Sequence, residues 1–229
     1  ISVASSSRGN GVVAKDLAQR WDIGLEMAEK TIESTTQRGV RTVDNPRLNR
    51  RFRTNDRQLR YRRLGVDMFT DTLEAGLKSK RGNKYAQAFG TSFGWSRAYP
   101  MRKKSEAHHG YSLLCSKVGV PDTMICDGAK EQILGDFRRK CRETDCHVKQ
   151  LEPYTPWANA AEGTIRELKK GSGRKMVKKR SPKVLWDDCL EYEAVLRSHT
   201  ALNLYGLQGE VPETLVTGQT ADISSLAEF

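Results

Sequence analysis

Three carboxylates in distinctive local sequences are the residues best suited to chemistry in this chain. Asp67 lies in Val-Asp-Met-Phe, Asp127 lies in Ile-Cys-Asp-Gly, and Glu162 ends the run Asn-Ala-Ala-Glu. Convergent carboxylates can hold two divalent metal ions about 3.5 to 4 Å apart, which activate an attacking oxygen and stabilise a leaving oxygen. Mg²⁺ prefers such oxygen ligands. Because 28 acidic residues generate many such triplets by chance, the prediction depends on the local context of each carboxylate.

Asp71 is the rival for the first of these carboxylates. It follows Asp67 by four residues, so in a strand it keeps the same face but lies nearer the strand's end. It also falls outside the Val-Asp-Met-Phe motif. We therefore predict the first ligand at Asp67 and keep Asp71 as the alternative.

An α/β pattern after Leu64 supplies the elements that must position these carboxylates. Short apolar runs bounded by glycines and polar turns predict strands, and apolar residues at helical spacing predict helices. Asp127 then lies at the end of the fourth strand, and Glu162 lies in a helix after a Pro-rich turn. The predicted strands cover residues 66–70, 85–90, 95–101, 120–126 and 147–152, and the other predicted helices cover residues 104–118, 129–143 and 182–202.

The charge of the chain predicts a polyanionic partner. Lys and Arg number 39 against 28 acidic residues, for a formal net charge of +11, and nucleic acid is a better candidate than an anionic membrane. Residues 41–63 form an Arg-rich connector whose guanidinium groups can pair with phosphates, with a solvated linker as the alternative. Within it we expect DNA contacts from Arg50, Arg51 and Arg53.

A second basic stretch follows Glu162. Arg166 and Lys169 lie four and seven residues after it, so a helix would place them on its face, where they can grip DNA near the metals. Further DNA contacts are predicted at Lys170, Arg174 and Lys175. Gly171 and Gly173 favour a mobile phosphate-contacting loop here, and a solubilising surface run is the alternative.

The N-terminal part has a different character. Residues 1–12 are Ser- and Gly-rich and are expected to be a flexible segment. Residues 13–40 follow a helix-turn-helix-like pattern, with apolar positions of two short helices on either side of Asp22-Ile23-Gly24. Such a unit can place its second helix in a DNA groove, but helix pairs with a Gly turn are also common as simple packing units.

Cysteine usage and hydropathy predict an intracellular protein. The five cysteines form no small-scaffold disulfide pattern, which is typical of a reducing compartment, and we expect buried thiols. Cys141, Cys146 and His147 lack a second ligand pair at zinc-finger spacing. No stretch approaches the roughly 20 consecutive apolar residues of a membrane helix, so no membrane partner is expected.

Residues 64–229 resemble the integrase of copia-type retrotransposons, whose retroviral-like catalytic core belongs to the RNase H-like superfamily. The segments that carry the resemblance are Val66–Phe69, Gly119–Asp127, Tyr154–Pro156, Asn159–Glu162 and Pro212–Gln219. The resemblance implies an α/β fold with a mixed five-stranded sheet flanked by helices. The catalytic core would cover residues 64–205, and residues 206–229 would extend it toward the rest of a polyprotein. Gly128 departs from the family's Asp-Asn-Gly, and the zinc module expected upstream is absent.

The same resemblance implies the function and its partners. The chain would catalyse 3′-end processing and DNA strand transfer, with Asp67, Asp127 and Glu162 as catalytic residues and as ligands of two Mg²⁺ or Mn²⁺ ions. Its partners would be element-end DNA, target DNA and further copies of itself, in the nucleus or in an element particle. Fold alone leaves open an RNase H-like nuclease without strand transfer. A catalytically decayed DNA-binding protein is the non-enzyme alternative.

Overall fold

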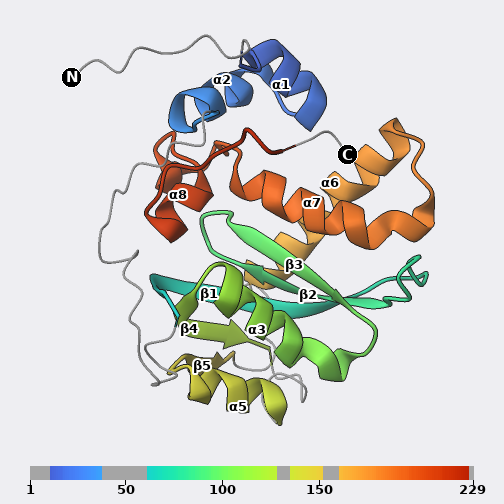
Figure 1. Ribbon diagram of the computed structural model, residues 1–229, viewed down its shortest axis with the longest axis vertical. Coiled ribbons are helices and arrows are strands. Elements are labelled where there is room, and N and C mark those ends of the chain that lie inside the picture. The colour runs from blue at the N-terminus through green and yellow to red at the C-terminus, as the bar shows by residue number, and fades with distance from the viewer. Residues whose placement is uncertain (1–10, 38–60, 128–134, 152–159, 227–229) are drawn as a thin grey trace.

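A mixed five-stranded sheet forms the centre of the molecule (Figure 1). The computed structural model describes residues 11–37, 61–127, 135–151 and 160–226. Strand order is β3-β2-β1-β4-β5; β2 is antiparallel to both β3 and β1, and β1, β4 and β5 are parallel to one another. The strands are β1 (Arg63–Glu74), β2 (Tyr85–Gly90), β3 (Ser96–Met101), β4 (Val120–Cys126) and β5 (His147–Gln150). This sheet confirms the predicted fold class.

Helices cover both faces of the sheet (Figure 1). Alternate residues of a strand point to opposite faces, so Met68 of β1 joins a core cluster with Tyr111 of α3, and Leu73 joins another with Leu168 of α6 and Leu190 of α7. The helices are α1 (Ala14–Trp21), α2 (Leu25–Ser34), α3 (Ala107–Lys117), α5 (Asp136–Glu143), α6 (Ala160–Lys178), α7 (Trp186–Ser198) and α8 (Pro212–Thr217). Short 3₁₀ turns are η2 (Lys104–Glu106), η4 (Lys183–Leu185) and η5 (Tyr205–Leu207).

Strand β1 is longer than its sequence pattern predicts. The prediction ended at Thr70, but the strand continues to Glu74 because its pairing with β2 runs without a break from Phe69↔Gly90 to Glu74↔Tyr85. Several of the additional residues are polar, and without the partner strand their sequence resembles that of a turn. Asp71 therefore lies within β1 and not beyond it.

Two helix predictions also differ from the structure. The helix predicted over residues 182–202 is the turn η4 followed by α7, which ends at Ser198. The described part of the helix predicted over residues 129–143 is α5, which begins at Asp136, after Gly135 in a positive-φ conformation (φ 74°). Residues 128–134 lie outside the described ranges.

The predicted N-terminal helix pair is present as α1 and α2, which lie at one end of the molecule over α7 and the C-terminal segment (Figure 1). Leu17 and Trp21 are buried in a cluster with Leu196 of α7 and Ile223. The backbone of Ala201 donates a hydrogen bond to the Thr31 hydroxyl, 2.9 Å away. The helix pair is therefore anchored to the core by its apolar face.

The outward face of α2 does not suit DNA. Its exposed side chains include Glu26, Glu29 and Glu33, and Lys30 is engaged by Glu26 at 2.7 Å. Phosphates bind to cations and are repelled by carboxylates. The structure therefore favours the packing interpretation of the helix pair over the insertion of α2 into a DNA groove.

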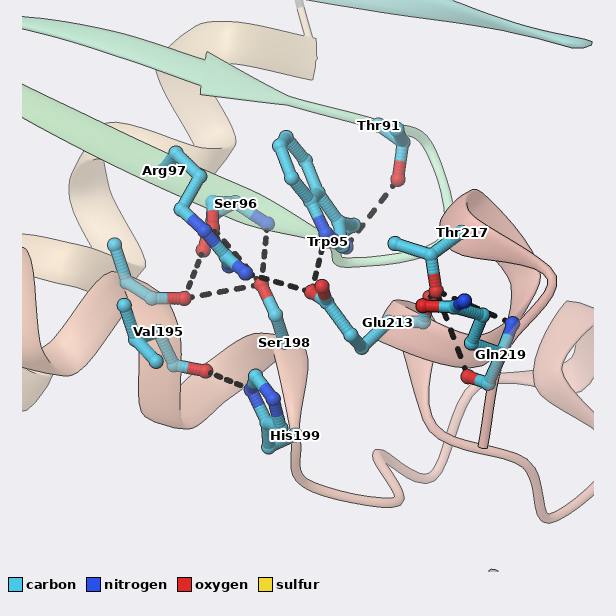
Figure 2. A network of polar contacts seen from close by, with 11 residues as sticks. Thr91, Trp95, Ser96, Arg97, Val195, Ser198, His199, Glu213, Thr217 and Gln219 are labelled. Atoms are coloured by element: carbon cyan, nitrogen blue, oxygen red, sulfur yellow. Dashed lines mark hydrogen bonds and ion pairs between the residues drawn. The ribbon is translucent and has the colours of Figure 1, made fainter. Parts of the chain in front are cut away.

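The C-terminal segment is part of the core. Half-buried Glu213 of α8 accepts hydrogen bonds from Trp95 Nε1 (2.8 Å) and from the Arg97 guanidinium (2.7 Å), as Figure 2 shows. In the same network the Ser198 hydroxyl of α7 accepts a hydrogen bond from the backbone of Ser96 (2.9 Å). Val216 of α8 is fully buried in the core cluster of β1 and α3. Residues beyond 205 thus close one end of the domain, where the sequence predicted only an extension.

The cysteines confirm one further prediction, that of buried thiols. All five cysteines are buried and free. Within the part of the chain that the structure describes, every helix is too short or too polar to cross a membrane.

Candidate catalytic site and nucleic-acid interface

Two carboxylates lie at the same level of the sheet, where the parallel strands β1 and β4 run side by side. Thr70 pairs with Cys126, and the next residue on each strand is an aspartate, Asp71 on β1 and Asp127 after β4. Neighbouring strands lie about 4.8 Å apart, so these two residues leave the sheet at the same level. Alternation places both on the face where Leu73 packs against α6 and α7. Asp127 is exposed and Asp71 is half-buried.

The same register corrects the prediction that Asp67 and Asp127 lie together. Asp67 is paired with Thr123, four residues before Asp127. At about 3.3 Å per residue, this offset separates Asp67 from the level of Asp127 by about 13 Å along the strands. Asp71, the rival ligand, is the residue that the fold places beside Asp127. A hydrophobic motif around Asp67 could not show this, because strand pairing sets the level of each residue.

Helix α6 brings Glu162 to the same face of the sheet. Glu162 is exposed in the first turn of the helix, while Ala161, Ile165 and Leu168 are buried beneath it. A close contact between β2 and α6 fixes the distance of this helical turn from the sheet. A Cβ added at Gly90 of β2 would lie 2.7 Å from the Thr164 hydroxyl of α6. Gly90 is the β2 partner of Phe69, two residues before Asp71. The first turn of α6 thus approaches the sheet near the Asp71 level.

The donor set suits a hard divalent cation, although its members are not gathered into a closed cluster. Within the described ranges, no three His, Cys, Asp or Glu side chains are grouped closely enough to hold a metal ion. Asp71 Oδ1 accepts a hydrogen bond from the Thr72 backbone at 2.6 Å, which orients the carboxylate. Carboxylate oxygens are the ligands that Mg²⁺ takes in phosphoryl-transfer sites, where it keeps several waters. The residues present therefore fit such an ion by chemistry.

The exposed face of α6 carries a row of cations beside Glu162. Arg166, Lys169, Lys170 and Arg174 are all exposed, and on a helix they lie within about 140° of arc that includes Glu162. None of the ion pairs found among the described residues engages these four side chains. They are therefore available to phosphates.

Lys175 is an exception to the predicted DNA contacts. Its side chain is 7% exposed, and its ammonium lies 2.7 Å from Glu193 Oε2 of α7, an ion pair without hydrogen-bond geometry. A buried charge that already has its counter-ion is not accessible to DNA. The prediction of a DNA contact at Lys175 is therefore wrong, because this residue lies on the inner face of α6.

The predicted mobile loop around Gly171 and Gly173 is also wrong. Helix α6 runs unbroken from Ala160 to Lys178. Gly171 is buried, and a Cβ at this position would collide with the Glu193 carboxylate. This glycine allows α6 and α7 to pack closely. Lys178, at the end of α6, reaches Asp22 at 3.0 Å and joins the N-terminal helix pair to the core.

Several predicted features lie outside the described residues. The contacts predicted in the connector are Arg50, Arg51 and Arg53, and the motif before Glu162 covers residues 154–159. They stay predictions.

The fold can be compared with known proteins at this point. No protein-family model and no curated protein matches the sequence. The catalytic core domain of BIV integrase is similar in structure, with 12% identity and a TM-score of 0.51, over 66% of this chain and 93% of that one. This chain has the fold of an integrase catalytic core. The HTLV-2 integrase catalytic core domain in complex with magnesium, in its trimeric form, gives 14% identity and a TM-score of 0.50, over 66% and 96% of the two chains.

A third similar structure is a chain of the simian T-cell lymphotropic virus intasome in complex with PP2A regulatory subunit B56 gamma. It shares 15% identity with a TM-score of 0.52, over 66% of this chain and 55% of that one. The chain thus spans about half the length of that protein. At such low identity the likeness establishes the fold, and the chemistry must be argued from the site itself.

Proposed function

We propose that this chain is a metal-dependent polynucleotidyl transferase that processes DNA 3′ ends and joins them to target DNA. One observation carries the proposal: the register of β1 and β4 sets Asp71 beside Asp127 on the face that α6 covers. Glu162 and the α6 cations are on the helix that reaches this face. We assign the catalytic and metal-binding roles to Asp71, Asp127 and Glu162, with Asp71 in place of Asp67.

The chain's own residues supply the binding half of the mechanism. Arg166, Lys169, Lys170 and Arg174 would hold the phosphates of a DNA strand along α6, with its reactive phosphodiester at the carboxylates. Asp71, Asp127 and Glu162 would hold two Mg²⁺ or Mn²⁺ ions. When bound, these ions would activate an attacking water or 3′-hydroxyl and stabilise the leaving oxygen. No covalent link to the protein is needed.

We also propose the narrower assignment to a copia-type retrotransposon. Its support is the sequence resemblance, including Pro212–Gln219, whose helix α8 closes the core through Glu213. An intasome chain and a trimeric core among the similar structures support a homo-oligomer acting on element-end and target DNA. Such an assembly would act in the nucleus or in an element particle.

A strand-transfer assay tests this proposal. A labelled duplex with a recessed 3′ end is incubated with the protein, a target duplex and Mg²⁺ or Mn²⁺. We expect joined products, and their loss in Asp71→Asn, Asp127→Asn and Glu162→Gln. Cleavage without joining would instead identify an RNase H-like nuclease. DNA binding that is salt-sensitive and unaccompanied by any cleavage would identify a catalytically decayed DNA-binding protein.

A further inference from the structure

A largely apolar groove of about 390 Å³ opens beside the proposed catalytic face, between the end of β1, helix α6 and the start of α7. This volume is in the range of small-ligand sites. Apolar and aromatic side chains form its walls, and two lysines are also among the residues that line it. The residues that line the groove include Leu73, Leu77, Lys169, Met176, Lys183 and Trp186.

The groove continues directly from the carboxylates. Leu73 follows Asp71 by two residues on the same face of β1, a step of about 7 Å. Lys169 follows Glu162 by seven residues on α6, about 10 Å along the helix axis. A strand whose phosphodiester lies at the carboxylates would therefore place a nucleotide one or two positions away at the mouth of this groove.

The charge around the groove suits an anion carrying an apolar group. Lys169 and Lys183 are exposed, and neither takes part in any ion pair found within the described ranges. The acid among the lining residues, Glu74, is already paired with Lys84 (3.1 Å) and Lys104 (3.8 Å). The groove thus combines two free cations with an aromatic and aliphatic interior.

We propose that this groove is a subsite for an unpaired nucleobase of the DNA substrate. The base would stack against the Trp186 indole, and its flanking phosphates would bind Lys169 and Lys183. Single-strand binding sites combine an aromatic surface with a cationic path in this way. An uncharged peptide segment would fill the apolar walls but would leave both lysines without a counter-charge. The inference rests on the proposed function, because it needs a DNA strand along α6.

Filling the groove gives the sharpest test. Gly173 lines it, and a Cβ at this position would meet no atom within 4 Å. Gly173→Leu should therefore extend into the groove from a Cβ that has open space around it, and leucine favours a helix more than glycine does. Val177→Leu is the matched control, since Val177 is 80% exposed on the same helix and lies outside the groove. Thermal unfolding of both variants would verify that the fold is retained.

Binding is measured in EDTA by fluorescence polarisation, with three DNA probes on the full chain. They are a blunt duplex, the same duplex with a four-base 5′ overhang, and the same duplex with a four-nucleotide abasic overhang of equal charge. We expect wild type and Val177→Leu to bind the overhang with bases at least about fivefold more tightly than the abasic one. Gly173→Leu should bind both overhangs equally and bind the blunt duplex like wild type.

These measurements distinguish a failure of the nucleobase subsite from a failure of the proposed function. Equal binding of base-bearing and abasic overhangs by wild type, with salt-sensitive binding of the blunt duplex, would overturn the nucleobase subsite and leave the proposed function intact. A base preference that survives in Gly173→Leu would also overturn the subsite, because the bases would then bind elsewhere. Absence of binding to all three probes would overturn the proposed function and this inference with it.

Discussion

Asp71 of β1 and Asp127, the residue after β4, occupy equivalent positions along neighbouring parallel strands, each one residue beyond the paired residues Thr70 and Cys126. Two carboxylates at the same level of neighbouring strands repel each other, and a divalent cation bound between them would relieve that repulsion. On the face that α6 covers, with the exposed cations of this helix alongside, the two carboxylates form the pair on which the proposed metal site rests. Asp67 instead pairs with Thr123 of β4, and the neighbouring carboxylate of that strand, Asp122, is engaged by Arg63 at 3.3 Å.

Exchange of Asp71 or of Asp67 for asparagine shows which of these two residues is the first metal ligand. Asp71→Asn should reduce metal-dependent cleavage at least about a hundredfold, because an amide oxygen holds a divalent ion less tightly than a carboxylate does. Asp67→Asn should retain activity within a few-fold. Single-turnover cleavage rates measured at saturating Mn²⁺ test this. The opposite ranking of the two variants would return the first ligand to Asp67.

Removal of Lys175 from its ion pair with Glu193 should lower the stability of the fold without weakening DNA binding. Lys175→Met leaves the Glu193 carboxylate buried without a partner, so the free energy of unfolding should fall by about 3 to 5 kcal/mol. Urea unfolding measures this change. The double variant Lys175→Met/Glu193→Leu should recover much of the loss, since both charges are then removed.

Lys170 provides the contrast on the outer face of the same helix. Lys170→Gln should leave the free energy of unfolding within about 0.5 kcal/mol of wild type. Its DNA affinity should fall, and the slope of log K against log salt should become shallower by about 0.9 if one phosphate contact is lost. Titrations with a duplex at several salt concentrations measure the slope. An unchanged slope would show that Lys170 does not contact a phosphate.

The contact between Gly90 and Thr164 predicts that a single methyl group disturbs the site. Gly90→Ala would place its Cβ 2.7 Å from the Thr164 hydroxyl, so α6 must shift, at a cost of about 1 to 3 kcal/mol in stability. Activity should fall as well, because Glu162 lies in the same turn. Thr164→Ala in the same chain removes the obstructing atoms and should restore both properties. Failure of this rescue would show that Gly90 is needed for another reason.

Glu213 should make the free energy of unfolding of the domain fall at acidic pH. Burial by itself raises the pKa of Glu213, but the charges of Arg97 and His199 and the hydrogen bonds from Trp95 and Arg97 more than offset it and lower the pKa below the ordinary 4.5. A carboxyl group whose pKa is lower in the folded state stabilises the fold at pH above 4.5. That contribution is lost as the pH falls through the folded-state pKa.

Glu213→Gln tests this assignment. The variant should lose about 3 kcal/mol or more at pH 7, because the half-buried Arg97 loses its counter-ion. Between pH 5 and pH 3 its free energy of unfolding should fall less steeply than that of wild type. Urea unfolding across this pH range measures both effects. Parallel plots of the free energy of unfolding against pH for the two proteins would show that Glu213 does not cause the loss of stability at acidic pH.

Local patterns were sufficient where the relevant forces are local. Apolar runs located all five strands to within a few residues, and Glu162 was correctly placed on a helix because helical spacing is visible in one segment. The position of Asp127 at the end of β4 was also correct. The end of β1 was not, because hydrogen bonds to β2 extend the strand through polar residues that have no strand pattern of their own.

The sequence by itself therefore determined the fold class, the helical and strand segments, and the presence of acidic and basic groups suited to DNA chemistry. Tertiary structure alone decided which residues meet. Register between β1 and β4 set Asp71 and not Asp67 beside Asp127, and close packing of α6 on α7 buried Lys175 against Glu193 while its neighbours stayed exposed. The physical reason is that the level of a residue in a sheet and the inner face of a helix depend on hydrogen bonds and contacts with segments distant in the chain, which no local pattern records.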